Sequence, residues 1–113
     1  MNMSGTAANA KGRANNERLT RKRKFKLEKI AMDKMEASAS LTQAQVLELI
    51  NYQYGYIGWC LGADKNQEAK KYLDKAEAAA LLLIKKQYKE SQAHAYLAAI
   101  YGFRVSLSPL KAP

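Results

Sequence analysis

Few residues in this chain of 113 could act as nucleophiles, bases or metal ligands. The sequence has one histidine, His94, and one cysteine, Cys60, and they form no metal-ligand spacing with each other or with Glu90. Cys60 stands in an apolar stretch, and such a setting raises the pKa of a thiol and makes it unreactive. We therefore interpret both as packing or surface residues and predict no enzymatic activity, no metal and no cofactor.

Three glycines could suggest a phosphate-binding loop, but their spacing argues against one. Gly55, Gly58 and Gly62 fall on one face of a helix, whereas a phosphate-binding loop joins a strand to a helix. We interpret them as packing glycines that let a neighbouring helix approach closely. The carboxylates of segment 66–87 alternate with lysines at the spacing of exposed helical ion pairs, so they predict no acid/base pair.

Aromatic side chains with polar tips are the best candidates for binding. Such side chains often anchor protein–protein interfaces. In proteins built from repeated pairs of helices, the first helix of each pair lines the concave binding face. The predicted contacts with a protein or peptide partner are Tyr52, Tyr56, Trp59 and Tyr96, with Tyr52 and Tyr56 on one exposed face. The alternative is that these rings fill space opposite glycine and alanine inside the fold.

A second candidate site is a cluster of cations near the N-terminus. Residues 1–35 carry ten Lys and Arg against three Asp and Glu, whereas residues 36–113 are nearly neutral. The cluster consists of Arg21, Lys22, Arg23, Lys24 and Lys26. Because cations bind nucleic acids through their phosphates, a nucleic-acid-binding adaptor is the alternative function. The same cluster can also be read as a solvated run of charge.

The elements that position these residues are helices. Helix-forming residues dominate the composition, and both prolines lie at the C-terminal end, which indicates an all-α protein. The repeat pattern described below implies that its helices form antiparallel helical hairpins. Helices are predicted at about 17–37, 42–62, 66–87 and 91–107. Thr42 and Gln45 have the spacing of a capping box at the start of the second helix.

The ends of the chain lack the pattern of packed helices. Residues 1–16 are polar and lack apolar periodicity, so we expect a disordered arm there, and we expect an extended tail at residues 109–113. No apolar run approaches the roughly 18 residues of a membrane span. The cationic cluster is also not followed by the apolar core of a signal peptide, which predicts a cytoplasmic location.

Segments 56–62 and 96–102 match each other in aromatic and small residues. Recurrence of one pattern at a fixed spacing along the chain is typical of helical repeat proteins. One pair of helices carries a further pattern, with Tyr54, Ile57, Gly58 and Leu61 in its first helix and Ala69, Leu73 and Ala76 in its second. Through these positions the chain resembles the tetratricopeptide repeat, which implies a helical repeat domain over 17–108 that binds proteins or peptides.

Residues from about 33 to 113 also resemble a family of uncharacterised bacterial tetratricopeptide-like proteins, through segments 35–38, 49–59 and 101–104. The resemblance implies that the protein is exported, which differs from the cytoplasmic location expected from the missing signal-peptide pattern. It also implies that the chain is part of a longer array of repeats. It brings no catalytic residues. Because repeats bury their faces only against neighbours, we expect the helix at 91–107 to meet another repeat or a second copy of the chain.

Overall fold

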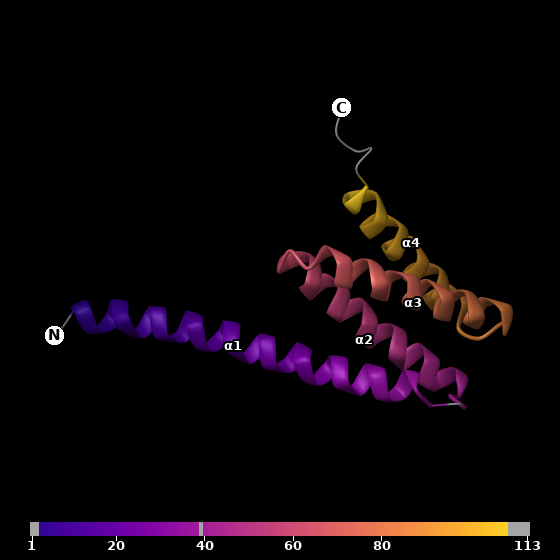
Figure 1. Cartoon of the computed structure of the whole chain (residues 1–113), viewed down its shortest axis with the longest axis horizontal. Coiled ribbons are helices and arrows are strands. Elements are labelled where there is room, and N and C mark those ends of the chain that lie inside the picture. The colour runs from indigo at the N-terminus through magenta and orange to yellow at the C-terminus, as the bar shows by residue number, and fades with distance from the viewer. Residues whose placement is uncertain (1–2, 39, 109–113) are drawn as a thin grey trace.

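The computed structural model describes residues 3–38 and 40–108 and contains four helices over that part of the chain (Figure 1). No strand occurs among those residues, so the predicted all-α class with antiparallel helical hairpins is confirmed. The helices are α1 (Met3–Glu36), α2 (Gln43–Gly62), α3 (Asn66–Lys85) and α4 (Glu90–Leu107).

The last three helices begin and end close to their predicted limits for local reasons. The Thr42 hydroxyl accepts a hydrogen bond from the Gln45 backbone at 3.1 Å, and the Gln45 side chain accepts one from the Thr42 backbone at 2.9 Å. This reciprocal pair is the predicted capping box, and it starts α2. Positive φ angles at Asp64, Gln87 and Lys89 then reverse the chain before α3 and α4.

The first helix differs from the prediction. It begins at Met3 rather than near residue 17, so the arm expected to be disordered is helical from Met3 onward. This segment contains several alanines and no proline, and adding a residue to an existing helix costs far less than starting one. The N-terminal half of α1 runs clear of the other helices, and residues 15–24 are exposed (Figure 1).

The core is centred on α2 and α3. α2 packs against α1 on one side and α3 on another, and α3 also packs against α4. Met32 of α1 is fully buried, while Phe25 and Met35 pack against the core from its edge. The largest fully buried side chains are Tyr72, Met32, Ile50, Ile57, Leu73, Leu83, Ile100, Gln53 and Cys60.

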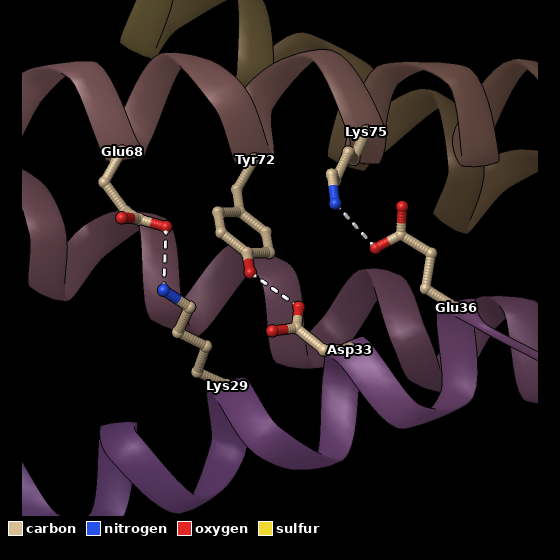
Figure 2. Close-up of polar contacts among 6 residues, drawn as sticks. All are labelled: Lys29, Asp33, Glu36, Glu68, Tyr72 and Lys75. Carbon is tan, nitrogen blue, oxygen red and sulfur yellow. Dashed lines mark hydrogen bonds and ion pairs between the residues drawn. The ribbon is translucent and has the colours of Figure 1, made fainter.

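A ladder of three polar contacts fastens α1 to α3 (Figure 2). It joins Lys29 to Glu68 (3.3 Å), Asp33 to the hydroxyl of Tyr72 (2.7 Å), and Glu36 to Lys75 (2.9 Å). In each contact the α3 residue lies 39 positions after its α1 partner. A constant offset means that the two helices run side by side in the same direction, while α2 and α4 return in the other (Figure 1).

Candidate binding cleft between α1 and α2

The four aromatic residues predicted to contact a partner do not form one surface. Tyr56 is only 4% exposed and packs edge-on against Tyr72, with 4.9 Å between ring centroids. Burial raises the pKa of the Tyr56 hydroxyl far above its usual range. Tyr56 is therefore a core residue, and the expectation that it is exposed is wrong, because its ring packs against Tyr72 of α3.

Tyr52 shares that side of α2 and lies half-buried under α1. Its hydroxyl donates a hydrogen bond to Glu48 at 3.0 Å, and this bond to a carboxylate raises the pKa of Tyr52. The ring forms one wall of a mainly apolar groove against α1, together with Leu27 and Ala31. Tyr52 thus faces α1 and not the helix that carries Tyr96.

Tyr96 belongs to a separate aromatic cluster between α2 and α4. Its ring meets that of Tyr54 edge-on at 5.6 Å, and Tyr54 also contacts Phe103 at 5.6 Å. The Tyr96 hydroxyl donates a hydrogen bond to Asn51 at 2.9 Å, and burial raises the pKa of Tyr96. Tyr96 and Trp59 therefore cannot contact one ligand as parts of a single aromatic face.

Trp59 lies in a cleft of about 740 Å³ between α1 and the C-terminal end of α2. We call it the cationic cleft. α1 forms one side, and the end of α2 with the turn into α3 forms the other. Its lining residues are Arg18, Leu19, Arg21, Lys22 and Phe25 from α1, and Gly58, Trp59, Gly62, Ala63 and Lys65 from the other side.

The floor of the cationic cleft is bare backbone. A Cβ atom added at Gly58 or Gly62 would meet no other heavy atom within 4 Å, and one added at Gly55 would meet only the edge of Phe25 at 4.0 Å. The expectation that these glycines let a helix pack closely is therefore wrong for Gly58 and Gly62, which leave one side of α2 open to the cleft. Gly55 lies against Phe25 of α1 and does not line the cleft.

The wall of the cleft is a stack of aromatic rings. The Trp59 ring lies 5.6 Å from Phe25 at an interplanar angle of 21°, and 5.8 Å from Tyr56 at 29°. The Lys65 ammonium lies 4.8 Å from the centroid of Trp59, a cation–π contact. Trp59 is thus held from several directions, and the stack connects the cleft to the core through Tyr56.

The rim of the cleft is cationic. Arg18, Arg21, Lys22 and Lys65 are all exposed, and none of the described residues that line the cleft is acidic. Sequence reasoning singled out Arg21 and Lys22 but missed Arg18 and Lys65. Arg18 was visible one helical turn before the cluster, whereas Lys65 is brought there only by the fold.

The remaining cations of the predicted nucleic-acid site point elsewhere. Arg23 and Lys24 line the groove beside Tyr52, and Lys26 is exposed outside both the groove and the cleft. Successive residues of a helix are rotated by about 100°, so a run of neighbouring cations surrounds α1 rather than forming one stripe. The cluster therefore divides between two surfaces.

The described part of the chain holds no group of three or more His, Cys, Asp or Glu side chains arranged to bind a metal ion. Cys60 is buried, and burial raises the pKa of its thiol, which keeps it protonated and a poor nucleophile. His94 is exposed on α4. Within the same described residues, no helix combines the length and the apolar character needed to cross a bilayer.

Comparison with known proteins gives no assignment for this arrangement, since no family model, curated protein or solved structure matches the chain.

Proposed function

We propose that this protein is a non-enzymatic, tetratricopeptide-like helical interaction module that binds an acidic polypeptide segment in the cationic cleft. The observation that carries the proposal is the convergence of four cations on a cleft with an aromatic wall and a glycine floor. The cleft joins one residue from the predicted protein-binding set, Trp59, with two from the predicted cationic set, Arg21 and Lys22.

Each part of the cleft suits an acidic peptide. Arginine and lysine bind carboxylates, and the two arginines can do so through paired hydrogen bonds. The bare backbone at Gly58 and Gly62 lets an extended segment approach α2 closely. The volume of about 740 Å³ falls among the roughly 300–1,000 Å³ pockets of small ligands, so the cleft suits a few side chains and not a folded domain.

Nucleic-acid binding by α1 is the alternative function. It is supported by the exposure of all five cations of the cluster on α1, which are Arg21, Lys22, Arg23, Lys24 and Lys26. Single-stranded nucleic acids bind by stacking bases on free aromatic faces. The Trp59 ring is already in contact with Phe25, Tyr56 and Lys65, which favours a peptide over a base in the cleft.

Titration with a labelled peptide that alternates glutamate with leucine tests the proposal by fluorescence anisotropy. Lys22→Glu reverses one charge at the rim, and we expect it to weaken binding about tenfold, the equivalent of ~1.4 kcal/mol. Lys26→Glu is the matched control, because it makes the same charge change on the same helix outside the cleft. Equal weakening by the two variants would contradict the cleft as the binding site.

A second variant tests the floor without changing any charge. Gly58→Leu places a side chain in the open space above α2, and we expect it to abolish peptide binding while the circular dichroism spectrum stays that of the wild type. Unchanged binding by Gly58→Leu would contradict the proposal. A single-stranded oligonucleotide that binds more tightly than the peptide, and loses affinity equally with Lys22→Glu and Lys26→Glu, would support the alternative function.

A further inference from the structure

Helices α1 and α3 share a short sequence that becomes meaningful once their contacts are known. Residues 32–37 and 73–78 match with four identities in six positions, and the other two positions are apolar in both. Each residue in 73–78 follows its match in 32–37 by the same number of positions as Asp74 follows Asp33. Since α1 and α3 also run parallel, the two helices are equivalent units of the fold.

The match includes Asp33 and Glu36 of the polar ladder, and the third α1 member, Lys29, lies just before it and also has a lysine counterpart on α3. Lys29, Asp33 and Glu36 bind α3, and the same residue types recur on α3 at the same spacing (Figure 2). The recurring residues are Lys70, Asp74 and Glu77. α3 therefore carries a second copy of the side chains with which α1 binds a parallel helix.

These α3 residues face outward. With Leu81 they form what we call the outer stripe of α3, defined as Lys70, Asp74, Glu77 and Leu81. The Asp74 side chain is 74% exposed and Leu81 is 49% exposed. Arg104 of α4 binds Asp74 at 2.9 Å and Glu77 at 3.5 Å, but a carboxylate accepts several hydrogen bonds, so both can take a further donor.

A helix suited to this stripe is present on the chain itself. The side of α1 opposite Met32 carries Arg23, Leu27, Ile30 and Lys34 at helical spacing, and Arg23 and Leu27 also border the groove beside Tyr52. Leu27 is 67% exposed and Ile30 is 56% exposed. We call these four residues the outer stripe of α1. Its cations complement the carboxylates on the outer stripe of α3.

The sequence match between α1 and α3 identifies one specific ion pair that a second α1 helix would form with α3. In the match between the two helices, Lys34 of α1 corresponds to Lys75 of α3. In the same way, Glu36 of α1 corresponds to Glu77 of α3. Lys75 and Glu36 form an ion pair at 2.9 Å. An α1 helix placed beside α3, as α3 lies beside α1, brings its Lys34 to Glu77.

We propose that the outer stripe of α3 binds the outer stripe of α1 from a second copy of the chain, parallel to it, with Lys34 of the second copy against Glu77. The two stripes are different surfaces, so the contact is head to tail and continues into a ring or an open filament. None of the four residues in the outer stripe of α1 lines the cationic cleft. This association and peptide binding can therefore fail independently.

Sedimentation velocity over a range of concentrations tests the proposal with charge-reversal variants. We expect the average mass of the wild type to rise with concentration, and Glu77→Lys or Lys34→Glu alone to weaken association at least about tenfold. An equimolar mixture of the two variants should recover association, because every interface in an alternating assembly then pairs unlike charges. Failure of the mixture to recover association would overturn the proposal.

A second test avoids Glu77, which also contacts Arg104. Leu27→Asp combined with Ile30→Asp changes two exposed side chains on the outer stripe of α1, and we expect a monomer with wild-type helicity. Lys26→Glu is the control and should associate like the wild type. A wild type that remains monomeric at every soluble concentration, or Glu77→Lys with undiminished association, would overturn the head-to-tail contact.

Discussion

The two sides of α2 differ sharply although they belong to one helix. On one side Gln53, Ile57 and Cys60 are at most 1% exposed, whereas on the opposite side Gly58 and Gly62 border open space. A helix is driven into a core by the apolar area that its side chains can bury, and glycine supplies almost none. The buried side therefore stabilises the fold, while the glycine side leaves room for a ligand.

The largest effect should come from the buried side. Ile57 is fully buried, and Ile57→Ala removes its packing and leaves a cavity. We expect a loss of about 2–5 kcal/mol in the free energy of unfolding, measured by urea denaturation. A loss below about 1 kcal/mol would show that the site collapses around the smaller side chain, and would weaken the contrast between the two sides.

The buried side also contains a polar group whose removal should stabilise the protein. Gln53 is 1% exposed, and its Oε1 atom has no hydrogen-bond partner in the described part of the chain. Gln53→Met has a similar volume and removes the unpaired acceptor, so we expect the free energy of unfolding to rise by about 1–2 kcal/mol. Gln67→Met, at an exposed position of α3, is the control. A destabilised Gln53→Met variant would mean that this amide is needed where it lies.

Tyr72 tests the contact of α1 with the core. Its hydroxyl donates to Asp33 at 2.7 Å, so Tyr72→Phe should cost about 1 kcal/mol at neutral pH. Burial, together with this hydrogen bond, raises the pKa of Tyr72 well above 10.0. In the unfolded chain Tyr72 loses its proton near pH 10, whereas in the folded protein it stays protonated. The contribution of Tyr72 to the free energy of unfolding is therefore complete below pH 10 and decreases as the pH rises above 10.

Urea denaturation at increasing pH measures this effect. Tyr72→Phe should reduce the alkaline loss of stability without removing it, because burial also raises the pKa of Tyr56. Tyr101→Phe changes an exposed tyrosine and should leave the alkaline profile as it is in the wild type. An unchanged profile in Tyr72→Phe would show that this hydroxyl does not stay protonated in the folded state.

The sequence predicted the features that depend on neighbouring residues. The capping box of Thr42 and Gln45 was predicted because its two partners are three positions apart, and the start of α2 follows from it. The shared face of Tyr52 and Tyr56 was also predicted, since it follows from helical periodicity. Periodicity does not say which helix covers a face, so the burial of Tyr56 against Tyr72 of α3 could not be predicted.

The candidate site depends on contacts between distant parts of the chain. Trp59 stacks on Phe25, and Lys65 joins Lys22 at the rim, only because α1 docks along α2 and α3. Glycines at helical spacing are equally consistent with a close helix and with an open cleft. The helical start of α1 was missed because a weakly apolar composition predicts disorder, whereas a helix anchored further along the chain propagates into it.

The smallest expected effect lies on the glycine side, and it has the opposite sign to that of Ile57→Ala. Alanine at position 58 meets no atom within 4 Å, and it restricts the unfolded chain more than glycine does. We expect Gly58→Ala to raise the free energy of unfolding by about 0.5–1 kcal/mol, measured by urea denaturation. Gly102→Ala on α4 also meets no atom within 4 Å and should give a similar gain.

If Gly102→Ala stabilised the protein and Gly58→Ala destabilised it, another part of the molecule would have to occupy the cleft in solution. The two sides of α2 would then both be packed, and the proposed peptide site would be closed.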